Sequence, residues 1–205
     1  MTSLKSNSLI PVMESFYSIQ GEGFHSGRPA YFIRLSGCDV NCHWCDVKES
    51  WDISKEQYTE VDEIVNKVLK TSAELVVITG GEPLMHDLSD LTKALKKEDK
   101  KIHIETSGTH PFTGDFDWIC FSPKKFKKPL DIYFSISDEL KIIICNKSDF
   151  KWAEQLSKKV KKNTKLIMQP EWSREEVISP LILEYIKLNP KWRISVQTHK
   201  YLNVE

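Results

Sequence analysis

Residues 37–46 read GCDVNCHWCD, and this stretch holds three of the five cysteines of the 205-residue chain. Cys38, Cys42 and Cys45 follow the spacing C-x3-C-x2-C. A short loop with this spacing can turn all three sulfurs inward, so that they converge on one inorganic centre. A cubane iron–sulfur cluster held by three cysteines keeps one iron open to a small molecule, which is a catalytic arrangement.

A second interpretation of the cysteine loop is a structural zinc site. Zinc in such a site takes four protein ligands, and here the fourth would be His43 or a distant residue. Cys120 and Cys145 are far from the loop in sequence and lie in apolar runs, so neither is an evident fourth ligand. On the cysteine spacing alone, the three-cysteine cluster and the zinc loop both remain open.

The sequence around the cysteine loop alternates between predicted strands and helices. Apolar runs predict strands at residues 12–19, 30–35, 74–78, 102–105, 118–121, 140–145, 165–168 and 193–196. Helical spacing predicts helices at residues 59–71, 87–95 (with Asp87 as the cap), 148–160 and 174–188. This alternation favours a mostly parallel sheet with right-handed crossovers.

The predicted fold class is α/β, in the form of an incomplete (partial) parallel β/α barrel. Residues 114–138 have too little helical pattern for a full crossover, so we expect fewer helices than strands. Because no internal repeat, low-complexity tract or linker is evident, residues 1–205 are expected to form a single domain. Residues 1–11 are expected to be a mobile lead-in.

Small and polar residues follow the ends of several predicted strands. They form the runs TGGEP at residues 79–83, ETSG at 105–108, SPK at 122–124 and QTHK at 197–200. In parallel α/β barrels, ligands bind on the face formed by the carboxyl ends of the strands. The runs therefore predict a single ligand-binding face, to which the cysteine loop also belongs.

Two features near the N-terminus each allow two interpretations. The run QGEG at residues 20–23 is either a hairpin turn or a loop whose glycines let a ligand approach closely. Arg34 interrupts an apolar strand four residues before Cys38, where an unpaired buried charge would be costly. Its guanidinium is expected either to clamp a carboxylate ligand or to pair with a structural acid.

The overall composition argues against several classes of partner. Lysine plus arginine and aspartate plus glutamate both number 29, so the net charge of zero predicts no nucleic-acid and no membrane partner. No stretch approaches the roughly 20 apolar residues of a membrane span, and no signal peptide is evident. An odd number of cysteines, three of them clustered, is typical of a reducing compartment, and we expect a cytoplasmic protein.

Taken together, these motifs resemble the radical S-adenosylmethionine (SAM) superfamily. The cysteine triplet and the GGEP run at residues 80–83 are shared across that superfamily. The QGEG run and the terminal QTHKYL run at residues 197–202 are similar to those of one family within it, the 7-carboxy-7-deazaguanine synthases. The matching motifs run from the first strand to the end, so the resemblance covers nearly the whole chain.

The resemblance implies a defined reaction. The enzyme would be a radical SAM carbon–nitrogen lyase that converts 6-carboxy-5,6,7,8-tetrahydropterin to 7-carboxy-7-deazaguanine with loss of ammonia, toward queuosine and other 7-deazapurines. The cofactors would be a 4Fe-4S cluster and SAM, with SAM reused after each turnover. The implied partners are the pterin substrate, a flavodoxin- or ferredoxin-type electron donor, and a second copy of the chain in a homodimer.

The same resemblance assigns expected roles to individual residues. The cluster would be held by Cys38, Cys42 and Cys45. SAM would be contacted by Trp44, Asp46, Gly81, Ser122, Lys124 and Gln169. The substrate would be contacted by Ile19, Gln20, Gly21, Arg34, Thr79, His199 and the terminal Glu205. No catalytic residue is expected beyond the cluster and SAM.

One residue departs from the family pattern. The synthases usually carry serine or threonine two positions after the third cysteine, where the hydroxyl helps to bind Mg²⁺ beside the substrate, but this chain has Val47. Magnesium prefers octahedral oxygen ligands and usually keeps several waters. Binding through substrate and water, binding with help from Asp46, and absence of the site all remain open, and we expect a weak dependence of activity on Mg²⁺.

Two other functions are compatible with part of the pattern. An activase for a glycyl-radical enzyme has the same cysteine spacing but acts on a protein partner, and the QGEG run and Arg34 favour the pterin substrate over it. A non-catalytic zinc- or cluster-binding module would need only the cysteine loop. The GGEP run argues against such a module, since a metal scaffold has no need to hold the methionine end of SAM.

Overall fold

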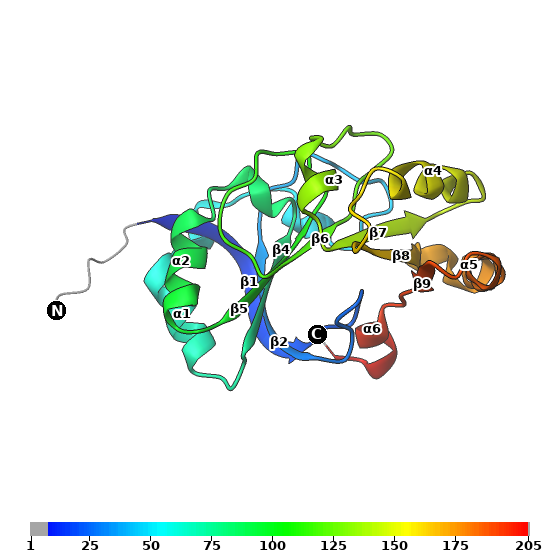
Figure 1. Ribbon diagram of the computed structural model, residues 1–205. Helices are drawn as coiled ribbons and strands as arrows, with labels where there is room; N and C mark the ends of the chain where they lie inside the picture. Colours follow the sequence, from blue (N-terminus) through cyan, green and yellow to red (C-terminus); the bar gives the residue numbers. More distant parts are fainter. Residues whose placement is uncertain (1–7, 205) are drawn as a thin grey trace.

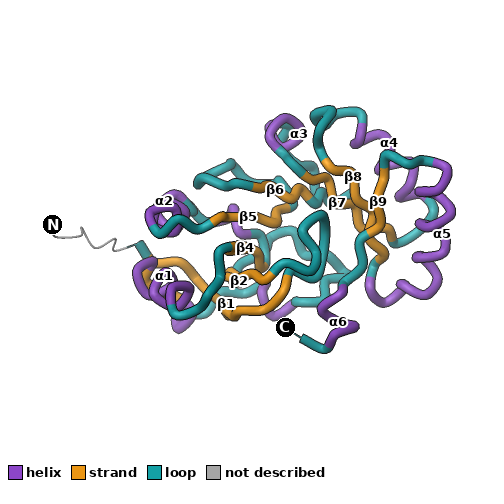
Figure 2. Tube along the Cα trace, turned by 60° about the horizontal axis from the view of Figure 1, so that its bottom comes forward, coloured by secondary structure: helices purple, strands orange, loops and turns teal. Residues whose placement is uncertain are grey.

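The computed structural model describes residues 8–204 of the chain, and its described strands form one sheet. The sheet has nine strands in the order β3-β1-β2-β4-β5-β6-β7-β8-β9. The strands from β2 to β9 are parallel to one another, whereas β1 pairs antiparallel with β2 and β3. Figure 2 shows the strands in an arc, with α1 to α5 outside it.

The bounds of the elements follow the chain order (Figure 1). The strands are β1 (Leu9–Ile19), β2 (Pro29–Leu35), β3 (Tyr58–Glu60), β4 (Leu75–Gly80), β5 (Lys101–Thr106), β6 (Trp118–Phe121), β7 (Glu139–Ile144), β8 (Lys165–Pro170) and β9 (Trp192–Ile194). The helices are α1 (Val61–Leu69), α2 (Ser89–Lys97), α3 (Ile132–Ile136), α4 (Ser148–Ser157), α5 (Glu175–Leu188) and α6 (Thr198–Leu202).

The predicted fold class is confirmed. In the described part of the chain, an open, mostly parallel sheet of nine strands is accompanied by six α-helices, so the barrel is incomplete and has fewer helices than strands. Residues 114–138 contain only the five-residue helix α3, as their weak helical pattern indicated. No helix in residues 8–204 has the length and apolar character needed to cross a membrane.

Several boundaries differ from the predictions. β1 begins at Leu9, so residues 9–11 belong to the sheet rather than to the expected lead-in, and residues 1–7 lie outside the described residues. Residues 59 and 60, expected at the start of a helix, belong to β3 because residues 58–60 pair with residues 9–11. Asp87 is not the cap of α2: Leu88 holds that position, and the Asp87 carboxylate accepts a hydrogen bond from the Ser89 amide at 2.9 Å.

Apolar side chains of the parallel strands pack outward under the helices, and the inner face carries both polar side chains and a second apolar cluster of Ala30, Phe32, Leu75 and Val77. On β7, Leu140, Ile142 and Ile144 pack in the main core beneath the helices. Glu139 and Lys141 alternate with them in sequence and line cavities on the inner side of the sheet. Successive strand residues point to opposite faces, so the alternation places a hydrophobic layer under the helices and charged groups inside the barrel.

The loop between β1 and β2 folds into the barrel and joins the two ends of the sheet. The Gly23 amide donates to Ser195 Oγ at 2.8 Å, just after β9, and the Phe24 amide donates to Glu139 Oε2 at 3.1 Å. The Thr198 amide, at the start of α6, donates to the Gly21 carbonyl at 2.9 Å. This hairpin loop (residues 20–28) therefore brings the first and last segments of the chain together inside the arc.

The core under α2 supports the sheet, and its loss should be measurable. Leu95 is fully buried, whereas Leu188 at the end of α5 is 83% exposed. We expect Leu95→Ala to lower the free energy of unfolding by about 3 kcal/mol, because the change leaves a cavity among packed side chains. Leu188→Ala removes the same atoms from an exposed position and should change the free energy of unfolding by less than about 0.5 kcal/mol. Urea unfolding followed by circular dichroism compares the two, and equal losses would contradict the assigned core.

Candidate active site

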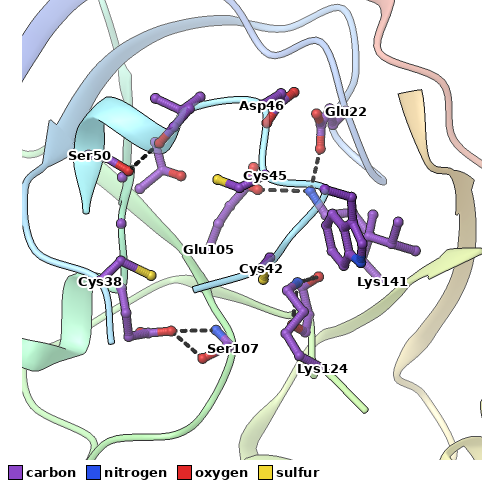
Figure 3. Close-up of a pocket in the computed structure, with 18 of the residues that line it drawn as sticks. Glu22, Cys38, Cys42, Cys45, Asp46, Ser50, Glu105, Ser107, Lys124 and Lys141 are labelled. Carbon is purple, nitrogen blue, oxygen red and sulfur yellow. Dashed lines mark hydrogen bonds and ion pairs between the residues drawn. The ribbon is translucent and has the colours of Figure 1, made fainter. Parts of the chain in front are cut away.

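The cysteine loop leaves the carboxyl end of β2 and is fixed by its own backbone. The Gly37 amide donates to the Ser50 carbonyl at 2.8 Å, and the Cys38 amide donates to the Trp51 carbonyl at 3.1 Å. The Cys45 amide donates to the Cys42 carbonyl at 2.9 Å, which closes a tight turn between the last two cysteines. All three cysteines are free thiols, and Figure 3 shows them around a common space.

The glycine run after β4 packs directly against this loop. The Gly81 amide donates to the Leu35 carbonyl at 2.9 Å, and the Glu82 amide donates to the Gly37 carbonyl at 2.8 Å. A Cβ atom at Gly81 would lie 2.2 Å from the Gly37 oxygen and 2.9 Å from Cys38 Cβ. Only glycine allows this approach, so the two motifs that the sequence singled out form one structural unit.

An open cavity with an empty volume of about 1040 Å³ lies over the cysteine loop, and we name it the cluster cavity. Its wall contains every residue that the sequence assigned to the cluster and to SAM: Cys38, Cys42, Cys45, Trp44, Asp46, Gly81, Ser122, Lys124 and Gln169. These residues come from the carboxyl ends of β2, β4, β6 and β8 and from the loops that follow them. The expected convergence on one face of the sheet is therefore observed.

A second cavity, the hairpin cavity, adjoins the first and has an empty volume of about 680 Å³. Its wall contains all the described residues that the sequence assigned to the substrate: Ile19, Gln20, Gly21, Arg34, Thr79 and His199. Glu205, the remaining one, lies outside the described residues. The two cavities share a wall formed by Glu22, Arg34, Asp46, Val47, Thr79, Glu105 and Gln197.

The hairpin loop is both a turn and part of a cavity wall, and Arg34 both pairs with an acid and faces the cavities. The Gln20 amide donates to the Arg28 carbonyl at 2.7 Å, as in a hairpin, while Gln20 and Gly21 line the hairpin cavity. Arg34 Nε donates to Glu14 Oε1 at 2.6 Å, and the residue also lines both cavities. Since that ion pair uses one of five guanidinium N–H groups, the others can bind an anionic ligand.

The sequence analysis did not identify Lys141, which lies at the centre of the inner face. Its side chain is only 4% exposed, and its Nζ lies 2.5 Å from Glu22 Oε2 and 2.8 Å from Glu105 Oε2 (Figure 3). Glu105 also accepts a hydrogen bond from Gln20 Nε2 at 3.1 Å. A lysine inside the apolar run LKIII at residues 140–144 was the available signal, because a charge in a buried strand needs a partner.

The charges of this triad determine its protonation states. Burial by itself would raise the pKa of Glu22, but the Lys141 ammonium and several hydrogen bonds lower it to about 2. Burial by itself would lower the pKa of Lys141, but Glu105 and Glu22 raise it well above its ordinary value. At neutral pH Glu22 is therefore ionised and Lys141 is protonated.

The donor set around the cluster cavity fits an iron–sulfur cluster with SAM. Three thiols surround one space beside a glycine backbone too close-packed for a side chain. Burial raises the pKa of Cys42 to about 11, with the nearby Lys124 ammonium opposing the shift, so iron binding would displace a thiol proton. Lys124 Nζ donates to Ser122 Oγ at 2.8 Å and lies 5.4 Å from the Trp44 ring, which gives this wall a fixed cation.

The residues present do not fit a magnesium site. Val47 lines both cavities with methyl groups, which offer no metal ligand. Asp46 Oδ2 already accepts hydrogen bonds from Lys200 Nζ at 2.6 Å and Gln197 Nε2 at 3.0 Å. Within residues 8–204, no group of three or more His, Cys, Asp or Glu side chains is arranged to hold a metal ion.

The low pKa of Glu22 should appear in the acid stability of the protein. The ordinary value is 4.5, so as the pH falls the unfolded chain binds this proton before the folded chain does. The stabilisation from Glu22 is therefore complete above about pH 4.5 and is lost as the pH falls toward about 2. Urea unfolding at about pH 5.5 and about pH 3.5 should show a smaller decline for Glu22→Gln than for the unmodified chain. Glu184→Gln, on the exposed side of α5, is the control, and its loss of unfolding free energy between the two pH values should equal that of the unmodified chain. Equal losses in all three proteins would disprove the assigned role of Glu22.

Comparisons with known proteins place the chain in a family. Residues 32–168 match the Radical SAM superfamily. The chain is 52% identical over 202 residues to 7-carboxy-7-deazaguanine synthase of Flavobacterium psychrophilum, covering 98% of this chain and 96% of that protein. It is 47% identical to the synthase of that name from Synechocystis sp., covering 95% and 93%. The crystal structure of QueE from Escherichia coli superposes with a TM-score of 0.84 at 30% identity, covering 93% of this chain and 95% of that one. The chain therefore belongs to the radical SAM superfamily and, within it, to the 7-carboxy-7-deazaguanine synthase family.

Proposed function

We propose that this protein converts 6-carboxy-5,6,7,8-tetrahydropterin to 7-carboxy-7-deazaguanine, with ring contraction and loss of ammonia, in the biosynthesis of queuosine-type 7-deazapurines. The observation that carries the proposal is the pair of adjoining cavities. Residues expected to hold the cluster and SAM line one of them, and residues expected to hold the substrate line the other. Because the two cavities share lining residues, ligands bound in them would lie next to each other, as a reaction between them requires.

The hairpin cavity supplies groups that suit a flat, carboxylated pterin. Arg34 offers guanidinium N–H groups for the carboxylate, and Gln20, Thr79 and His199 offer polar atoms around the ring. Phe16 and Phe32 lie on the apolar side, with ring centroids 5.3 Å apart in a stacked arrangement. Burial lowers the pKa of His199, so this histidine is neutral at pH 7 and has one donor and one acceptor nitrogen.

The cluster cavity would hold the cofactors through side chains already fixed in place. Cys38, Cys42 and Cys45 would hold a 4Fe-4S cluster, which when reduced supplies the electron that generates a hydrogen-abstracting radical from SAM. SAM itself would be bound by Trp44, Asp46, Gly81, Ser122, Lys124 and Gln169. Lys141, Glu22 and Glu105 lie in the wall of this cavity.

We further propose the context in which the enzyme acts. A low-potential donor of the flavodoxin or ferredoxin type would reduce the cluster, and the chain would act as a single-domain subunit of a cytoplasmic homodimer. No nucleic-acid or membrane partner is needed for the reaction. An activase function would require a large protein to reach the cluster cavity, whereas the hairpin cavity is lined by polar and aromatic side chains that suit a small-molecule ligand.

Turnover tests the proposal directly. The cluster is reconstituted and reduced without oxygen, SAM and 6-carboxytetrahydropterin are added, and the product is followed by ultraviolet absorbance and mass. We expect 7-carboxy-7-deazaguanine over many turnovers while SAM is largely spared. If SAM is instead cleaved to 5′-deoxyadenosine and no product appears, the substrate assignment is wrong and an activase function becomes the better explanation.

The cysteine assignments have their own test. Cys42→Ala removes one of the three thiols and should abolish both the iron–sulfur absorbance after reconstitution and all product formation. Cys145→Ser alters a half-buried cysteine outside the cluster cavity and should retain both. Iron analysis and visible spectroscopy provide the measurement. A Cys42→Ala variant that binds iron like the unmodified chain would exclude the three-cysteine cluster.

A further inference from the structure

We propose that the Lys200 ammonium serves as the fixed cation of the substrate site, in the place where a divalent metal ion would otherwise be bound. The proposal rests on the proposed function, since it assumes an anionic substrate in the hairpin cavity. It makes Lys200 a substrate-binding residue, and it makes the reaction independent of Mg²⁺. Four observations about the residues around Asp46 support it.

The first observation is that residue 47, two positions after Cys45, offers no oxygen to a metal ion. Val47 presents methyl groups to both cavities. Its carbonyl points away to the following turn, where it accepts the Ser50 hydroxyl at 2.7 Å and the Ser50 amide at 3.2 Å. The one hydroxyl of this turn is therefore used within the loop itself, and the turn supplies none of the oxygen ligands that magnesium prefers.

The second observation is that the neighbouring carboxylate already has a cation. Lys200 Nζ lies 2.6 Å from Asp46 Oδ2, and Gln197 Nε2 lies 3.0 Å from the same oxygen. A metal ion bound to Asp46 would meet the ammonium at close range, and two cations at that separation repel strongly in a partly buried site. The Asp46 carboxylate can therefore pair with the Lys200 ammonium or with a metal ion, but not with both.

The third observation is that Lys200 is held in place from several sides. Besides its contact with Asp46, its Nζ donates to Gln197 Oε1 at 3.1 Å and lies 4.4 Å from the centre of the Trp172 ring. Its side chain is 21% exposed. The helix α6 that carries it is tied to the hairpin loop by the bond from Thr198 to Gly21. An ammonium positioned in this way needs little further ordering when a ligand binds.

The fourth observation is the charge of the hairpin cavity. Glu22, Asp46 and Glu105 line it with carboxylates, and Arg34 and Lys200 are the cationic side chains among its lining residues. A substrate carboxylate that enters this cavity needs a cationic side chain whose charge is not fully neutralised by these three carboxylates. Arg34 is shared with Glu14, and Lys200 has three donors of which Asp46 and Gln197 use two. The remaining donor is available to an anionic oxygen of the substrate.

Metal binding tests the proposal without relying on turnover. The reconstituted enzyme is titrated with Mn²⁺, a paramagnetic stand-in for Mg²⁺, in the presence of SAM and 6-carboxytetrahydropterin, and free Mn²⁺ is measured by electron paramagnetic resonance. We expect no stoichiometric binding by the unmodified chain. Lys200→Met together with Val47→Thr removes the competing cation and adds a hydroxyl, and this double variant should bind Mn²⁺ at least about tenfold more tightly. Equal binding by the two proteins would overturn the proposal.

Kinetics provide the second measurement. The activity of the unmodified enzyme should change by less than about twofold when Mg²⁺ is removed, and Lys200→Met should raise KM for the pterin by about tenfold or more. Lys191→Met is the matched control, because Lys191 also lies 2.6 Å from a carboxylate, that of Glu154, but lies far from both cavities. Adding Mg²⁺ should partly rescue the double variant and leave Lys200→Met unchanged.

The outcomes separate this proposal from the proposed function. An unmodified enzyme that needs Mg²⁺, or a Lys200→Met variant with the KM of Lys191→Met, would overturn the role of Lys200 while leaving the reaction intact. An enzyme that cleaves SAM but forms no product would refute the proposed substrate, and the Mn²⁺ titration with SAM alone would still decide between lysine and metal. Thermal melting and cluster absorbance confirm that each variant is folded and loaded.

Discussion

The buried ammonium of Lys141 is the constraint around which the interior of this protein is built. A charge on the inner face of a sheet is tolerated only when it is paired and hydrogen-bonded, because its transfer from water is otherwise too costly. Glu22 and Glu105 meet that requirement from two directions, one from the hairpin loop and one from β5. The pairing fixes the hairpin loop inside the arc of strands and so creates the wall shared by the two cavities.

A second constraint is the close contact between the cysteine loop and the glycine run. Backbone bonds from Gly81 and Glu82 reach the segment that leads into Cys38, and no side chain fits between them. Glu82 is itself buried and accepts hydrogen bonds from Thr106, Ser107 and Leu84, which ties the ends of β4 and β5 together. The cofactor face is therefore preorganised by the protein backbone, and cofactor binding need not assemble it.

The polar interior also explains how a chain lacking the expected hydroxyl can retain the family's site. In the hairpin cavity, Arg34 is paired with Glu14 and Lys200 is paired with Asp46. Lys200 comes from α6, near the end of the chain, and Asp46 comes from the cysteine loop near its beginning. Only the folded chain brings these two residues together.

The sequence by itself determined the features that depend on local pattern. Apolar runs located the parallel strands, and the motifs at their ends located the cysteine loop and the glycine run. The resemblance of these motifs to a known family supplied the residues expected to contact SAM and the substrate, and the described ones line the two cavities. The tertiary structure alone decided which charges meet. The pairs Lys141–Glu22 and Lys200–Asp46 join residues more than 100 positions apart, and the short elements β3 and α6 exist because they pair with distant segments. Such contacts leave no local periodicity, because their energy comes from partners that only folding brings together.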